Sequence, residues 1–108
     1  MITIRLNGID FNVLLLNPDD KRFIYRGTAR CGTTYFDTGS IHIDNTLPPA
    51  IMRQVVAHEL THAYIMAYGF HAHGKYDDEE LCEFMAAYGA SICSDADAVM
   101  KHYAKAEV

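Results

Sequence analysis

The sequence predicts an α+β fold, a small and mainly antiparallel N-terminal β-sheet packed on C-terminal helices. Two observations support this prediction: the first 46 residues have strand-like patterning broken by turn signals, and the period becomes helical from residue 47. The chain has 108 residues, of which 50% are hydrophobic and 21% charged, so we expect one folded domain over residues 1–108. No internal repeat, low-complexity tract or linker divides it.

The N-terminal strands are delimited by turn signals. Apolar and polar residues alternate first, and Asn7-Gly8 is the pair that a type I′ hairpin turn prefers. The cluster at 17–20 predicts a further turn. Phe23-Ile24-Tyr25 fits either a strand or a short helical turn, and His42 is expected to be exposed or at an edge. The predicted strands are Ile2–Leu6, Ile9–Leu16, 30–36 and 41–44.

The C-terminal half predicts two or three helices. Pro48-Pro49 suit a first turn, and residues 51–68 contain no breaker until Gly69. After a loop at 70–76, the acidic run at 77–80 suits the positive start of a second helix, which continues to about residue 93. Ser94-Asp95 can cap a third helix through Tyr103.

Composition excludes several classes of partner. A net charge of −5 argues against nucleic acid, because that affinity comes mostly from Lys and Arg. No apolar run approaches the roughly 18 residues of a membrane span, and no secretory signal or basic cluster is visible. Cys31, Cys82 and Cys93 are too few and too scattered for a disulfide framework, so we expect a reduced, cytoplasmic setting with each thiol buried as a small hydrophobe.

The first predicted helix contains His58-Glu59-Leu60-Thr61-His62, an HExxH sequence. Imidazoles at positions i and i+4 lie one turn apart on the same face and can reach one zinc ion. Glu59 lies beside them, close enough to polarise a zinc-bound water and to take its proton. The motif therefore predicts a zinc site with His58 and His62 as ligands and Glu59 as the catalytic residue.

Helical phase places this motif in a stripe that we expect to face the core. At about 100° per residue, Val56 and Leu60 lie outside the motif's sector. Burying two histidines and a glutamate without compensation is costly, and a metal ion in an open cleft removes that cost. This favours a metal site over a chance match on a surface helix. The apolar residues that share the motif's sector are Ile51, Met52, Val55, Ile65 and Met66.

A catalytic zinc site needs a third protein ligand. An HExxHxxGxxH arrangement is excluded, because Ile65 and Tyr68 occupy the positions of its glycine and third histidine. His71 and His73 come too late to replace them in register. The remaining source is the acidic start of the second predicted helix, which offers Glu79, Glu80 and Glu83.

Together the two motifs resemble those of the gluzincin metallopeptidases, over residues from about 40 to 93. The second motif of the thermolysin-like members, Asn-Glu-x-x-Ser-Asp, is matched by Asp78-Glu79-Glu80-Leu81-Cys82-Glu83. The tract 79–86 is also similar to the Glu-x-x-Ala-x-x-Phe-Ala pattern of the phage-associated, immunity-type metallopeptidases. Both alignments imply Glu79 as the third ligand, and the first implies Glu83 as the acid that orients a ligand histidine. The departures at Asp78 and Cys82, with a shorter gap between motifs, leave Glu80 open as the alternative ligand.

Chain size and element order look most like the minigluzincins and small prophage-encoded zinc peptidases. The resemblance implies a zincin-like minimal core, in which the sheet packs on an active-site helix and a second, ligand-bearing helix. It also implies an edge strand just before the active-site helix that aligns an extended substrate, and residues 39–44 occupy that place. Gluzincins usually add a Tyr or His that stabilises the oxyanion. The candidates here are His71, His73 and Tyr76, with Tyr88 on the second helix.

The resemblance implies a zinc-dependent metallopeptidase that hydrolyses peptide bonds in a peptide or protein substrate, with Glu59 activating a zinc-bound water. An alternative is a zinc-binding but catalytically latent protein-interaction module. It is kept open because 108 residues supply only one wall and the floor of a cleft, so that a protein partner would complete it. A metal-free structural domain is the third hypothesis.

Overall fold

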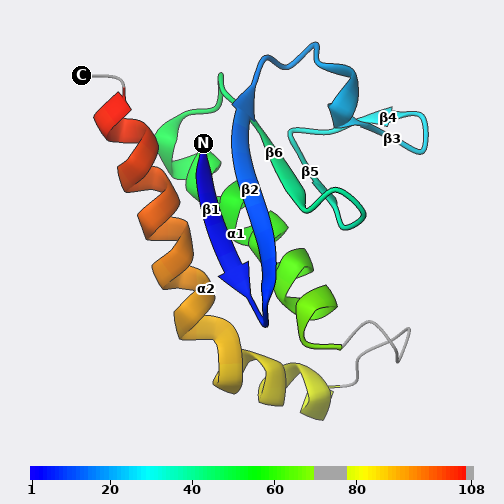
Figure 1. The fold of residues 1–108 in the computed structure, drawn as a ribbon, viewed down its shortest axis with the longest axis vertical. Coiled ribbons are helices and arrows are strands. Elements are labelled where there is room, and N and C mark those ends of the chain that lie inside the picture. Colours follow the sequence, from blue (N-terminus) through cyan, green and yellow to red (C-terminus); the bar gives the residue numbers. More distant parts are fainter. Residues whose placement is uncertain (70–77, 107–108) are drawn as a thin grey trace.

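The computed structural model describes residues 1–69 and 78–106, and its fold is α+β, as the sequence predicts (Figure 1). A four-stranded sheet has the order β1-β2-β6-β5, and a separate two-stranded sheet pairs β3 with β4. Two helices complete the described part of the chain. The elements are β1 (Ile2–Leu6), β2 (Ile9–Leu16), the 3₁₀ turn η1 (Lys21–Phe23), β3 (Ile24–Tyr25), β4 (Thr28–Ala29), β5 (Gly32–Tyr35), β6 (Ser40–Asp44), α1 (Pro49–Ala67) and α2 (Asp78–Ala106).

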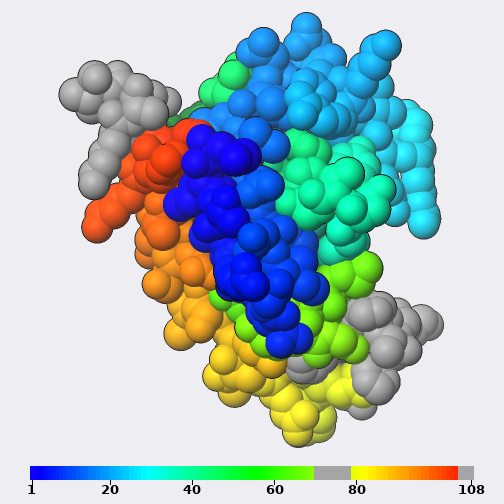
Figure 2. All heavy atoms as spheres, in the orientation of Figure 1, coloured from blue at the N-terminus to red at the C-terminus, as the bar shows by residue number. Residues whose placement is uncertain are grey.

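The sheet is mixed, with two antiparallel pairs around one parallel pair. β1 and β2 form the predicted hairpin, and Asn7 and Gly8 both have positive φ angles, 50° and 80°, as a type I′ turn requires. β2 pairs with β6 in parallel, in the register Val13 to Ile41. β6 then pairs with β5 antiparallel, in the register Thr33 to His42. In the space-filling view the β1–β2 hairpin borders α2 on one side and the β5–β6 region on the other (Figure 2).

The expected edge strand at residues 39–44 is an interior strand, so that prediction is wrong. β6 lies between β2 and β5, and β5 forms the edge of the sheet. The reason is the parallel pairing of β6 with β2, which places β6 directly beside the N-terminal hairpin. β5 is joined to β6 by a short turn and takes the outer position. The strand exposed beside α1 is therefore β5.

α1 and α2 bury their apolar rows against the sheet and against each other. On α1 the buried row includes Val56 and Leu60, which the predicted sector excludes, whereas Ile51 is 47% exposed. The predicted core face of this helix is therefore right only in part: Met52 and Glu59 of the predicted stripe are buried, but both motif histidines are exposed. The helix is apolar on more than one side, and the row with the small residues Ala63 and Ala67 takes the core position. The core cluster unites residues from the sheet and both helices: Ile4, Leu6, Phe11, Val13, Ile41, Ile43, Met52, Val56, Leu60, Ala63, Tyr64, Ala67, Phe84, Ile92, Ala96 and Val99.

α2 is one continuous helix, and the separate third helix from Ser94-Asp95 does not form. Ile92, Ala96 and Val99 are buried at helical spacing across that point, so the apolar row continues without a break. The Asp95 carboxylate accepts a hydrogen bond from the hydroxyl of Tyr64 on α1. This bond joins the two helices. No helix in the described ranges is long and apolar enough to cross a membrane.

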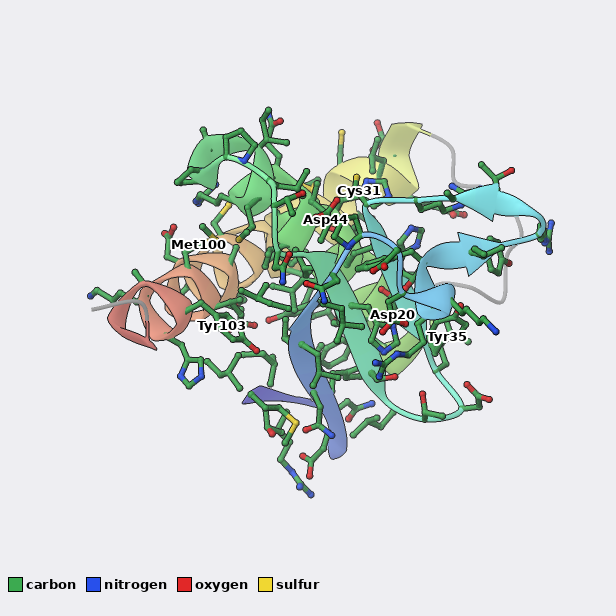
Figure 3. The ribbon with its side chains drawn as sticks, turned by 90° about the horizontal axis from the view of Figure 1, so that it is seen from above. Asp20, Cys31, Tyr35, Asp44, Met100 and Tyr103 are labelled. Atoms are coloured by element: carbon green, nitrogen blue, oxygen red, sulfur yellow. The ribbon has the colours of Figure 1, made fainter. Side chains whose placement is uncertain are left out.

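The segment between β2 and β5 packs on the β5 side of the other face, where Phe23 of η1 is buried and the hydroxyls of Thr33 and Tyr35 donate to the Arg22 carbonyl. His42 of β6 is only 1% exposed under this cover, so the expectation of an exposed or edge histidine is wrong. Asp20 begins η1, where its carboxylate accepts hydrogen bonds from the backbone and guanidinium of Arg22. These bonds lower the pKa of Asp20 to about 2. In Figure 3, Asp20 and Tyr35 both lie on the side of the β3–β4 hairpin.

The three cysteines are exposed rather than buried. Cys82 and Cys93 lie on α2, whose core face is taken by larger side chains such as Phe84 and Ile92. Cys31 lies just before β5, where its backbone carbonyl accepts a hydrogen bond from the Asp44 N–H at 3.0 Å (Figure 3). The prediction of three buried thiols is therefore wrong.

Candidate metal centre and active site

The side chains of the HExxH motif lie together on α1. Ligand atoms of His58, Glu59 and His62 all lie within 4.8 Å of one another. The two imidazole rings meet edge to face with their centroids 4.9 Å apart, as expected for neighbours one helical turn apart. This is the cluster of potential metal ligands found in the described ranges 1–69 and 78–106.

Glu59 is the buried member of this cluster. It is 6% exposed, whereas both histidines are exposed at the surface of α1. Its Oε1 accepts a hydrogen bond of 2.8 Å from the hydroxyl of Thr34 on β5, and the same hydroxyl lies 3.3 Å from the Glu59 backbone carbonyl. Oε2 of Glu59 lies 3.9 Å from Nε2 of His58. The edge strand therefore holds this carboxylate beside the two imidazoles.

Gly32 allows β5 to approach α1 this closely. A Cβ atom at this position would lie 2.7 Å from Cγ1 of Val55 and 3.0 Å from Cγ of Glu59. The 2.7 Å distance is shorter than real Cβ contacts, so a side chain here would force Val55, the strand or the helix to shift, and the 3.0 Å distance is tight. An isolated glycine within a strand pattern signals close backbone approach, and this is the signal in the sequence that could have predicted a role for Gly32.

Two hollows adjoin the motif, with cavity volumes of about 420 and 440 Å³. Both are lined by Arg30, Gly32, His58 and Glu59, so they form one groove along β5 with the motif in its wall. The first hollow is also lined by Tyr25, Thr33, Thr34, Tyr35, Phe36, Asp37 and His62. The second is also lined by Ala29, Cys31, Gln54 and Val55.

The predicted ligands from the second helix stand apart from this cluster. Glu79, Glu80 and Glu83 lie in the first turns of α2, and none of them belongs to the group of clustered ligand atoms. Glu79 and Glu83 are exposed. Their roles as third ligand and as orienting acid remain predictions.

Of the predicted oxyanion stabilisers, Tyr88 is among the residues that the structure describes. His71, His73 and Tyr76 lie outside the described residues. Tyr88 packs in a row of aromatic rings between the helices, with its ring centroid 4.6 Å from that of Tyr68. It does not line either hollow.

The donor set fits zinc. Imidazole nitrogens and carboxylate oxygens are preferred zinc ligands. Two histidines one helical turn apart and the neighbouring glutamate bring such atoms together in the wall of the groove. Because both histidines are exposed, the cost of burying them no longer argues for a bound metal ion. The position of both histidines in the wall of the groove now supports a metal site instead. Comparisons with protein-family models, with curated proteins and with solved structures find no match for this chain.

Proposed function

We propose that this chain is a zinc-dependent metallopeptidase that hydrolyses peptide bonds in the groove beside β5. The observation that supports this most is the position of Glu59, buried in the groove wall beside His58 and His62 and held by the Thr34 hydroxyl. His58 and His62 would hold the zinc, with Glu79 as the third ligand that the gluzincin resemblance implies. When bound, zinc supplies a Lewis acid that acidifies water and polarises a carbonyl.

The chain's own residues then carry out the proton transfers. Glu59 accepts a proton from the attacking water as its oxygen bonds to the carbonyl carbon. The same carboxylic acid returns that proton to the leaving amine as the carbon–nitrogen bond breaks. Thr34 keeps the carboxylate in place through both steps. The outer edge of β5 offers backbone groups with which an extended peptide can pair.

The proposed substrate is a peptide or an unfolded protein segment, with no nucleic-acid or membrane partner. A net charge of −5 argues against a phosphate backbone as ligand. We also propose a cytoplasmic location. Three free, exposed thiols are compatible with a reducing compartment, where disulfides are rare.

Metal analysis combined with cleavage of an unstructured protein tests the proposal. We expect about one zinc ion per chain in the wild type. Glu59→Gln should retain zinc and lose at least about a hundredfold in rate, because the general base is removed. His58→Gln and His62→Gln should lose both zinc and cleavage, and His102→Gln, on the exposed side of α2, serves as the control. Absence of zinc, or cleavage unaffected by Glu59→Gln, contradicts the proposal.

The third ligand is tested by separate glutamine substitutions at Glu79, Glu80 and Glu83. If Glu79 binds the metal, Glu79→Gln should weaken zinc affinity far more than Glu80→Gln. Glu83→Gln should have a smaller effect, about 10- to 100-fold in affinity, as for residues that only orient a ligand. A loss of zinc in Glu59→Gln instead would identify Glu59 as a ligand rather than a base.

The alternative is a zinc-binding, catalytically latent protein-interaction module. It is favoured by one observation, that no carboxylate of the described part of α2 belongs to the motif's ligand cluster. In this case the wild type binds zinc but leaves unstructured proteins intact, and a protein partner completes the cleft.

A further inference from the structure

The rim of the groove carries a fixed arginine that the proposed mechanism does not use. Arg30 lies between β4 and β5 and lines both hollows beside His58 and Glu59. Its backbone N–H donates a 2.9 Å hydrogen bond to the carbonyl of Phe23, a buried residue. The start of the Arg30 side chain is therefore anchored to the core rather than carried on a loose loop.

The guanidinium of Arg30 is oriented by an aromatic ring. Its Cζ atom lies 5.4 Å from the ring centroid of Tyr25, which also lines the groove. Arg26 lies 5.2 Å from the same ring but does not line either hollow. Such cation–π contacts hold a guanidinium in place and leave its N–H groups free to donate.

Arg30 has no carboxylate partner among the described side chains, those of residues 1–69 and 79–104. The arginine–carboxylate pairs there join Arg5 to Asp10, Arg22 to Asp20, and Arg53 to Asp97. An arginine beside a groove, already held by a ring and lacking an anion, can accept a carboxylate in bidentate geometry.

Charged side chains of both signs line the groove. Residues 21–36 contain four cations and no acid, in a chain whose net charge is −5. The acids that line the groove are Glu59, in its wall, and Asp37, which follows the far end of β5 and accepts a 3.1 Å hydrogen bond from the Thr38 N–H. Arg30, just before β5, is the Arg or Lys side chain that lines these hollows, and Asp37 follows the other end of the strand.

From this arrangement we propose that Arg30 binds a carboxylate of the peptide substrate and gives the enzyme a preference for acidic peptides. The inference rests on the proposed peptidase function. The carboxylate comes either from an Asp or Glu side chain near the cleaved bond or from a free C-terminus, and both present the same planar anion to Arg30.

The experiment uses peptides derived from one cleaved sequence, with Glu or Gln at successive positions and with a free or an amidated C-terminus. For the wild type, kcat/KM should be about tenfold higher for the acidic member of a pair, as for one charge-assisted hydrogen bond at an exposed site. Arg30→Gln should abolish this preference, Arg30→Lys should retain part of it, and the matched control Arg26→Gln should keep it. A preference for the free C-terminus alone identifies the chain end as the source.

A binding measurement keeps this test independent of turnover. Fluorescence anisotropy on the zinc-supplemented Glu59→Gln chain, with and without Arg30→Gln, reports the affinity for each labelled peptide. Equal affinity and equal kcat/KM for Glu and Gln peptides, or an equal preference in Arg30→Gln, overturns the role of Arg30 while leaving the peptidase proposal in place. Absence of both zinc and cleavage overturns the proposed peptidase function instead. Even in that case, tighter binding of Glu peptides that disappears with Arg30→Gln supports carboxylate recognition by Arg30.

Discussion

The hydroxyl of Thr34 donates a 2.8 Å hydrogen bond to Oε1 of Glu59, across the contact between β5 and α1. Glu59 is buried, so the bond also provides a partner for a carboxylate oxygen that is removed from water. Its other oxygen, Oε2, lies 3.9 Å from Nε2 of His58. The edge strand therefore orients the proposed general base, and any movement of β5 would move this carboxylate relative to the histidines.

Replacing Thr34 with valine tests this coupling. The change keeps the shape of the side chain and removes the donor, so Oε1 of Glu59 loses its partner. We expect an unfolding free energy lower by about 1–3 kcal/mol and kcat/KM lower by about tenfold, with zinc content retained. Urea denaturation, metal analysis and peptide cleavage measure the three quantities. Thr34→Ser should restore most of the activity, and Thr38→Val, whose hydroxyl bonds Ser40 at the surface, is the control. Wild-type kcat/KM in Thr34→Val would contradict the coupling.

Gly32→Ala should separate β5 from α1. The new methyl group would meet Cγ1 of Val55 at 2.7 Å and the Glu59 side chain at 3.0 Å. Overpacking of this kind costs about 1–3 kcal/mol, and the resulting shift should also lower cleavage because Thr34 moves with the strand. Denaturation midpoints and kcat/KM provide the measurements.

Two further variants distinguish overpacking from a general effect of alanine. Adding Val55→Ala to Gly32→Ala removes the closest contact and should recover part of the lost stability. Gly89→Ala on α2 meets only the flexible Met85 side chain at 3.1 Å, so it should stabilise the helix by about 0.5–1 kcal/mol. If Gly32→Ala is as stable as the wild type, close approach of the two elements is not the reason for a glycine at this position.

Local patterns predicted the strands and the chemistry, whereas non-local pairing decided the geometry. The β1–β2 hairpin follows from alternation and from Asn7-Gly8, which are adjacent in sequence. The order of β6 and β5 depends on a parallel pairing between β2 and β6, which are separated by residues 17–39, and no local signal specifies it. The edge strand at residues 39–44 was implied by the family resemblance, and this pairing makes it an interior strand instead.

The candidate site shows the same division. HExxH brings His58, Glu59 and His62 together through helix geometry alone, so three of its members could be predicted. Thr34 precedes Glu59 by 25 residues and reaches it only through tertiary packing. The core face of α1 was predicted only in part, because apolar residues lie on more than one side of the helix. Only the sheet's position shows that the side with Val56 and Leu60 is the buried one.

His42 should make the stability of the fold depend on pH. Its Nδ1 lies 3.1 Å from the Thr33 hydroxyl, which in turn lies 3.0 Å from the carbonyl oxygen of Arg22. Burial lowers the pKa of His42 below its ordinary value of 6.5; the nearby Arg22 charge adds to this shift and Asp20 opposes it. The Tyr35 ring packs against the imidazole, with the two centroids 5.4 Å apart.

The sign of this dependence follows from proton binding. Below pH 6.5 His42 binds a proton in the unfolded chain, whereas in the folded chain it stays neutral to lower pH. The unfolding free energy should therefore fall as pH drops below about 6.5. Urea denaturation at several pH values between about 8 and 5 measures the slope. His42→Gln should show a shallower slope than the wild type, and His102→Gln, an exposed site, should not change it. An identical slope in His42→Gln and the wild type would show that His42 does not contribute.

The hydrogen bond between Tyr64 and Asp95 should be a main stabilising contact between α1 and α2. The Tyr64 hydroxyl donates to Oδ2 of Asp95 at 2.5 Å, and burial, followed by this bond, raises the pKa of Tyr64 well above its ordinary value of 10.0. Tyr64→Phe leaves the carboxylate without its donor and should lower the unfolding free energy by about 1.5–3 kcal/mol. Tyr68→Phe, which keeps its stacked ring on Tyr88, is the matched control.

Alkaline titration tests the same contact from the opposite direction. Above pH 10 the unfolded chain releases the Tyr64 proton while the folded chain retains it, so wild-type stability should fall as pH rises through 10. Tyr64→Phe lacks this proton and should lose less stability over that range. Urea denaturation between about pH 8 and 11 compares the two chains, with Tyr68→Phe expected to follow the wild type. A Tyr64→Phe chain with wild-type stability at neutral pH and the wild-type alkaline slope would show that the helices are held together by apolar packing alone.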